Sequence, residues 1–143
     1  LLIIAIIAIL TPVLTYTPKI REGFCWIDVN STHLKSRVKS NGVFDVLSMS
    51  LFTQTNIPDW YFVCLINSEL ISLYVDNFIN NTSHFQINDA RQLPIVIPSE
   101  SGIEYFQNIY LEALRIKNHE STTYSETSIQ EMLDCFVRKL YSI

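Results

Sequence analysis

The segment from Pro58 to about Ile79 constrains the fold more than any other part of this 143-residue chain. Proline fits the first turn of a helix, where its missing N–H has no intrahelical partner to lose. Apolar side chains then recur every three or four residues, a spacing that places them on one face of a helix. The members of this stripe are Phe62, Leu65, Ile66, Leu70, Leu73 and Tyr74. The segment therefore predicts one long helix, which buries Trp60, Phe62 and Leu65 in a core.

The residues ahead of this helix, 23–52, have the pattern of strands and turns. Aromatic and β-branched side chains over 24–29 predict one strand, and a polar turn follows it. Residues 34–39 alternate between apolar and basic side chains, which predicts a second strand. The Asn41-Gly42 pair is a strong hairpin-turn signal, and the apolar residues 43–47 come directly after it. We therefore expect a hairpin within a small sheet.

Shorter elements follow the long helix. Residues 84–87 have an extended pattern, Asn88-Asp89 predicts a turn, and residues 93–97 predict a short apolar strand that ends at Pro98. Together with the elements before them, they predict an α+β fold in which a small mixed or antiparallel sheet packs on one long helix.

The last third of the chain predicts two helices, at about 103–117 and 128–141. Ser101 with Glu104, and Thr127 with Gln130, have the spacing of capping boxes. In such a box each side chain satisfies a backbone N–H group that the first helical turn leaves without a partner. A polar loop separates the two helices, so we expect a C-terminal antiparallel helical hairpin.

The chain divides into an apolar start (1–19), an α+β domain (20–98) and a helical tail (99–143). Its first residue is Leu1 rather than Met, so we expect a fragment of a longer protein. The apolar run 1–14 is shorter than the roughly 20 residues that a membrane-spanning helix needs. No basic segment stands ahead of it, as a signal peptide would require. Because the three cysteines form no CxxC pair, we expect a reducing, cytoplasmic location.

Side chains suited to catalysis or metal binding show no recognisable arrangement. His33, His84 and His119 lie far apart in the sequence, and no local signature surrounds the cysteines. The three glycines are isolated, which excludes a P-loop or a GxGxxG turn. We therefore expect no catalytic residue and no metal ligand, and we expect Cys64 and Cys135 to be buried in helices.

A row of cations lies in the N-terminal half of the chain. Residues 1–58 carry five cations and three anions, whereas 59–98 and 99–143 each have a net charge of −3. In an extended strand Lys35, Arg37 and Lys39 share one face, at intervals of about 6–7 Å. Such a row can meet the backbone phosphates of DNA. The alternative is an ordinary solvated strand face.

A polar loop follows the long helix. Amide and hydroxyl groups of the kind it contains are suited to reading base edges in the grooves of DNA. The alternative interpretation is a plain helix terminus. The polar residues of this loop are Asn80, Asn81, Ser83, His84 and Gln86.

Three stretches of the chain together resemble a known protein family. The first comprises Gly23-Phe-Cys-Trp-Ile-Asp-Val29, Arg37 and Asn41-Gly-Val-Phe-Asp-Val46. The second contains Leu65-Ile-Asn-Ser-Glu-Leu70 and Gln92-Leu-Pro-Ile-Val-Ile-Pro98, and the third is an amphipathic helix ending in Leu140-Tyr141. They resemble the C-terminal target-recognition region of adenine-specific DNA methyltransferases, as found in fused restriction–modification enzymes and in BREX-type phage-resistance systems. Asn41 and Ser142 depart from the pattern, which usually has a lysine and a glycine there.

The resemblance implies that catalysis takes place outside this chain. The family transfers a methyl group from S-adenosylmethionine to N6 of adenine, and its catalytic motifs lie in an upstream domain. These motifs are a glycine-containing cofactor motif and an (N/D)PP(Y/F) loop, and neither occurs in this sequence. The chain would thus bind double-stranded DNA on behalf of that methyltransferase domain, with no cofactor or metal of its own. Lys35, Arg37 and Lys39 would contact phosphates, and the polar loop, with Arg91 near it, would contact bases.

A non-enzymatic α+β protein-interaction module is the alternative function. The net charge of −3 over residues 99–143 repels DNA, and the tail helices could instead pair with a protein partner. In one form of this alternative the module is tethered to a membrane through residues 1–14, although a membrane partner is not what we expect.

Overall fold

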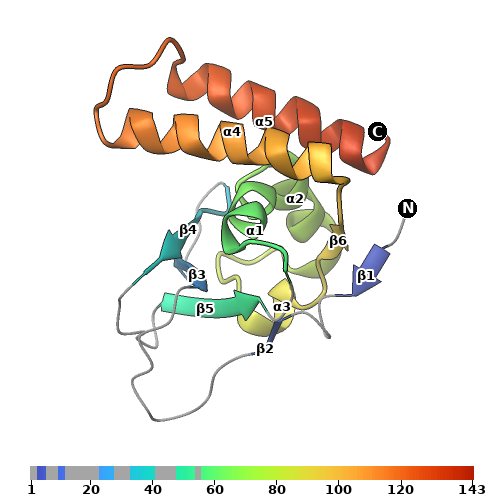
Figure 1. Ribbon diagram of the computed structural model, residues 1–143. Helices are drawn as coiled ribbons and strands as arrows, with labels where there is room; N and C mark the ends of the chain where they lie inside the picture. Colours follow the sequence, from blue (N-terminus) through green and yellow to red (C-terminus); the bar gives the residue numbers. More distant parts are fainter. Residues whose placement is uncertain (1–2, 6–9, 12–22, 28–32, 41–47, 54–55) are drawn as a thin grey trace.

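The structure is a computed structural model that describes residues 3–5, 10–11, 23–27, 33–40, 48–53 and 56–143. Figure 1 shows a small sheet, a central group of helices and a helical hairpin that crosses them on the side away from the sheet. The predicted α+β class is confirmed. The expected turn at Asn41-Gly42 and the apolar strand at 43–47 lie outside the described residues.

The main sheet is antiparallel, with the strand order β2-β5-β3-β4. Strand β3 (Gly23–Ile27) lies between β4 (Ser36–Lys39) and β5 (Ser48–Thr53), and β2 (Leu10–Thr11) pairs with the other side of β5. The described strand that follows β4 in the chain therefore pairs with β3 rather than with β4. This order leaves β4 at the edge of the sheet.

A separate pair of strands joins the start of the described chain to the segment just before the helical hairpin. Strand β1 (Ile3–Ala5) runs antiparallel to β6 (Pro94–Val96), which lies within the predicted strand 93–97. Two tyrosine hydroxyls donate to β6 as well: Tyr61 to the carbonyl of Val96, and Tyr141 to the carbonyl of Pro94. The final helix is thereby tied to this strand.

The predicted long helix is present but divided. Helix α1 (Asp59–Ile66) ends at Asn67, helix α2 (Glu69–Tyr74) follows, and a π-helical turn, η2 (Val75–Ile79), completes the segment. The two parts meet at an angle of 65°. Ser68 causes the break, because its hydroxyl donates to the carbonyl of Leu65 (2.6 Å) and accepts from the N–H of Ile71 (3.4 Å). It thus ends one helix and caps the next.

Helix α1 is buried on every side rather than along one stripe. Its residues from Tyr61 to Ile66 are all buried, because α1 lies between the sheet and the helical hairpin. Phe62 and Leu65 lie in the core as expected, whereas Trp60 is only half-buried and stacks on Tyr110. Leu73, a member of the predicted stripe, is exposed, since α2 leaves the direction of α1. An apolar helix without a polar face is typical of a core helix.

A single helical turn, α3 (Ile87–Ala90), stands where the sequence predicts an extended segment followed by a turn at Asn88-Asp89. The carboxylate of Asp89 accepts the backbone N–H of Gln86 at 2.8 Å, so the first turn of a helix forms around this bond. Local capping therefore decides the conformation of the segment.

The C-terminal helices form the predicted hairpin, with α4 (Glu100–Lys117) packed on α5 (Glu126–Tyr141). Both begin earlier than the sequence predicts. Ser99 caps α4 by accepting the N–H of Gly102 (3.3 Å), and Ser125 caps α5 by accepting the N–H of Ser128 (3.1 Å). Both caps have extended backbones, whereas the predicted caps Ser101 and Thr127 lie inside the first turns.

One core joins the sheet, the central helices and the hairpin. Phe24 of β3 stacks on Phe62 of α1, with ring centroids 5.5 Å apart. On the other side of α1, Tyr61 meets the ring of Phe106 edge-on at 5.0 Å, and Phe106 meets Phe136 of α5 at the same distance. Burial of each such ring stabilises the fold by about 1.5–3 kcal/mol. The hairpin is therefore part of the core.

Among the described residues, no single helix has the length and apolar composition of a membrane span. The bent pair formed by α1 with α2 and η2 meets the criterion by length and composition alone. Within the run 1–14, the described residues 3–5 and 10–11 are strands.

Candidate nucleic-acid interface

The cationic row lies on the edge strand β4 and on the residue just before it. Leu34 is buried and Val38 is packed against the core, so the alternate residues turn away from the core. Lys35 and Arg37 are exposed, and Lys39 is half-buried. This is the alternation that the sequence predicts. Lys35 precedes the regular strand by one residue, because β4 begins at Ser36.

A side chain from the helical break holds β4 in place. Asn67 accepts the backbone N–H of Ser36 through Oδ1 (2.6 Å) and donates through Nδ2 to the backbone carbonyl of Ser36 (3.0 Å). The hydroxyl of Ser36 adds bonds to Asn67 Oδ1 (3.2 Å) and to the carbonyl of Val63 (3.4 Å). The residue between Lys35 and Arg37 is therefore fixed by hydrogen bonds to the end of α1.

The chain leading into β4 has a second anchor. The hydroxyl of Ser72 on α2 accepts the N–H of Leu34 at 3.1 Å. Ser72 is itself buried, so this bond is shielded from competing water. Residues 34–36 are thus held by side chains from both halves of the divided helix.

The polar loop is organised largely by its own hydrogen bonds. Asn80 donates to the carbonyl of His84 (2.8 Å) and to the carboxylate of Asp89 (3.0 Å). Its Oδ1 accepts the N–H (2.9 Å) and the hydroxyl (2.7 Å) of Thr82. The amide of Asn80 therefore serves the loop itself, which favours the interpretation as a helix terminus for this residue.

The other residues proposed to contact bases lie on either side of Phe85, whose position is fixed. Phe85 is buried, and its carbonyl accepts the indole N–H of Trp26 on β3 at 2.8 Å. Arg91 is half-buried and donates to the Oδ1 of Asn88 at 3.0 Å. The exposed candidates of this loop are Asn81, Ser83, His84 and Gln86.

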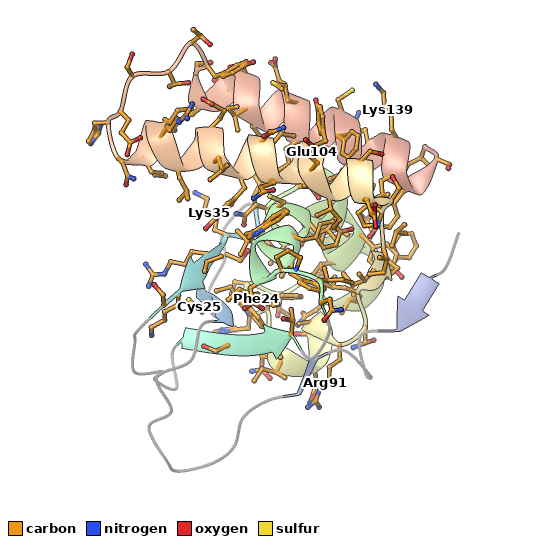
Figure 2. The ribbon with its side chains drawn as sticks, viewed as in Figure 1. Phe24, Cys25, Lys35, Arg91, Glu104 and Lys139 are labelled. Carbon is orange, nitrogen blue, oxygen red and sulfur yellow. The ribbon has the colours of Figure 1, made fainter. Side chains whose placement is uncertain are left out.

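The two sets of candidates are not gathered into one patch. Figure 2 shows Lys35 beside the helical hairpin, whereas Arg91 lies at the opposite end of the molecule, below the sheet in this view. The structure therefore places the cationic row and the Arg91 end of the loop on separate parts of the surface.

The cysteines have two different environments. Cys25 and Cys64 are buried, and burial raises the pKa of the Cys64 thiol to about 12. Cys64 is therefore a protonated, unreactive thiol at neutral pH. Cys135 is exposed, which corrects the expectation that it is buried. The buried positions of α5 are Ile129, Leu133 and Val137, and Cys135 falls between them on another face.

An open hollow of about 490 Å³ lies where α5 crosses the start of α2. The carboxylate of Asp134 accepts the N–H of Glu69 at 2.7 Å, and Arg138 forms a salt bridge with Glu69 at 2.6 Å. These charged groups therefore serve helix packing. Among the described residues, no group of three His, Cys, Asp or Glu side chains could hold a metal ion. The hollow is lined by Glu69, Glu131, Asp134, Cys135, Arg138, Lys139 and Ile143.

Two tyrosines, the buried Tyr61 and the half-buried Tyr141, also have raised pKa values. Burial raises the pKa of Tyr141 to about 12 and raises that of Tyr61 further. Both hydroxyls donate to carbonyls of β6, so their role is to attach α1 and α5 to this strand.

No protein-family model matches this chain, and no curated protein matches it either.

Proposed function

We propose that this chain binds double-stranded DNA through β4, as the target-recognition part of an adenine-N6 DNA methyltransferase of a restriction–modification or phage-defence system. The observation that carries the proposal is the held edge strand: two exposed cations, Lys35 and Arg37, flank a residue that Asn67 fixes on both sides. Lys39 continues the row and is the third proposed phosphate contact. An ordered row of cations neutralises backbone phosphates and sets the register of a protein on the duplex.

In this proposal the chain supplies DNA binding and the upstream methyltransferase domain supplies S-adenosylmethionine and catalysis. The polar loop is the proposed base-reading element, with Asn81, Ser83, His84 and Gln86 as its exposed members. Asn80 shapes the loop from within, and Arg91 contributes a charge at its far end. In this proposal the methyltransferase acts in the cytoplasm.

The test is the salt dependence of binding to a pool of DNA duplexes. Three phosphate contacts give a slope of about −2.7 for the logarithm of affinity against the logarithm of salt concentration. Affinity then falls about 40-fold between 50 and 200 mM salt. Substitution of Lys35, Arg37 and Lys39 by glutamine is expected to weaken binding and to remove most of this slope.

The matched control removes cations from another surface. Lys117→Gln with Lys139→Gln changes two exposed cations of the hairpin and leaves β4 intact. This control is expected to bind with the slope of the wild-type chain. If the wild-type chain is folded and shows no salt-dependent binding, or if both sets of variants lose binding equally, the proposal is wrong.

One observation favours the second candidate, a protein-interaction module. Helix α4 exposes Leu111 and Leu114 on a tail whose net charge is −3. Exposed leucines one helical turn apart are suited to contact with another apolar surface. A folded chain that fails to bind DNA at low salt would favour this function over DNA recognition.

A further inference from the structure

Asn67 forms hydrogen bonds with the two peptide groups on either side of Ser36. The N–H of Ser36 belongs to the peptide group shared with Lys35, and its carbonyl belongs to the peptide group shared with Arg37. Asn67 bonds both, at 2.6 and 3.0 Å. Because the orientation of these two planes sets the direction in which the flanking Cα–Cβ bonds leave the strand, Asn67 helps to fix where the side chains of Lys35 and Arg37 begin.

These two bonds act on a short strand at the edge of the described sheet. In the described sheet β4 is an edge strand of four residues, and β3 is its only partner strand. Ser36 stands opposite Trp26 in this pairing. The bonds from Asn67 supply, on the outer edge, the constraint that a further strand would supply inside a sheet.

Asn67 is itself anchored from two directions. Its backbone N–H donates to the carbonyl of Val63 at 3.0 Å, which continues α1 to this residue. Its carbonyl accepts from Nε2 of Gln130 on α5 at 3.1 Å. The side chain that holds β4 is therefore attached to both the central helix and the hairpin.

We propose that Asn67 is a positioning residue for DNA binding: it holds β4 so that Lys35 and Arg37 meet backbone phosphates together. This inference rests on the proposed function and adds to it a residue that does not touch DNA. Without the two bonds, the start of β4 keeps, as its link to α1, only the weaker bond from the Ser36 hydroxyl to Val63, and the spacing of the two cations is less fixed. Fewer phosphates are then neutralised at once, and the salt dependence decreases.

The test is a double-mutant cycle on the whole chain, with an unselected pool of DNA duplexes as the probe. Its four members are the wild type, Asn67→Ala, Lys35→Gln with Arg37→Gln, and the combination of all three changes. In the wild-type background, Asn67→Ala is expected to lower affinity about 5- to 10-fold and to reduce the salt slope by about one phosphate. In the charge-depleted background it is expected to change neither quantity, because Asn67 acts only through those cations.

A stability control separates positioning from general damage. Ser125→Ala removes the cap of α5, which destabilises the chain at a site away from β4. It is expected to leave both affinity and salt slope unchanged at a temperature where every variant is folded. If Asn67→Ala does not fold, Asn67→Gln takes its place, because it keeps the amide and displaces it by one methylene group.

Two results overturn the inference in different ways. If the substitution at Asn67 lowers affinity by the same factor in both backgrounds, its effect is purely structural and only the positioning role is wrong. If the wild-type chain shows no salt-dependent binding, the proposed function fails, and this inference fails with it.

Discussion

Replacement of Phe106 by alanine tests whether the hairpin and the α+β part unfold as one unit. Phe106 is 0% exposed and meets Tyr61 of α1 and Phe136 of α5, both at 5.0 Å. Truncation of a buried phenylalanine costs about 3–5 kcal/mol. A chain of 143 residues has a free energy of unfolding of about 7–20 kcal/mol, so the variant is expected to stay folded.

The assay is urea unfolding followed by two signals. Far-UV circular dichroism reports the helices, and a Trp60→Phe background leaves Trp26 of β3 as the only tryptophan. With a dependence on urea of about 2 kcal/mol per molar, a loss of about 4 kcal/mol lowers the midpoint by about 2 M. Both signals are expected to shift together, because one core connects β3 to the hairpin.

The matched control is Leu114→Ala, which truncates an exposed residue of the same helix. It is expected to change the free energy of unfolding by less than about 0.5 kcal/mol. A Phe106→Ala variant in which only the helical signal moves, while Trp26 keeps its wild-type midpoint, would refute the argument for a shared core.

Two further changes have clear expected outcomes. The first is Gly102→Ala, a change that normally stabilises a helix. Here the new Cβ would stand 2.8 Å from the Cβ of Pro98, so we expect the free energy of unfolding in urea to fall by about 1 kcal/mol. The control Ser101→Ala is expected to change it hardly at all. Burial raises the pKa of Cys64 from its ordinary 9.0 to about 12, so the unfolded chain loses this proton at a lower pH than the folded chain does. The stability that this group contributes is complete below about pH 9 and decreases from there to about pH 12. The urea midpoint of Cys64→Ala is therefore expected to fall less than that of the wild type between pH 8 and 10. An equal fall in both proteins would contradict this reasoning.

Patterns that depend on near neighbours predicted much of this fold. The spacing of apolar residues located the central helical segment and both helices of the hairpin, and the alternation at 34–39 predicted which cations face outward. The break at Asn67 was not predictable in this way, because neither proline nor glycine marks it. The serine that makes the break, Ser68, is not distinguished in the sequence from the other serines of the chain, and its bonds to Leu65 and Ile71 are known only from the structure.

Other errors follow from choices between neighbouring candidates. Strand β5 lies at Ser48–Thr53, directly after the predicted strand 43–47, which lies outside the described residues. Serines close to each helix start offer more than one cap, and the extended backbones of Ser99 and Ser125 decide between them. The wrong prediction that Cys135 is buried was avoidable. The buried positions of α5 are spaced by four, and Cys135 falls two residues after one of them, Leu133.

The candidate site was only partly visible in the sequence. Composition indicates that the loop after the long helix is rich in polar groups, but it does not say which of them are already used. Asn80 makes four hydrogen bonds within the loop and to α3, and these require the folded positions of Thr82, His84 and Asp89. Asn67 was part of a recognisable stretch, yet its bonds to β4 appear only in three dimensions.

The hydrogen bonds between Asn67 and Ser36 also affect what else can attach to this sheet. An edge strand with open N–H and C=O groups is a template on which another chain can add a strand, and aggregates grow in that way. Here an amide side chain already occupies one such pair of groups, and the exposed charges of Lys35 and Arg37 stand on either side of it. At Ser36 the strand therefore presents its flanking cations to a polyanion, while the backbone groups that a second protein chain would pair with are already bonded to Asn67.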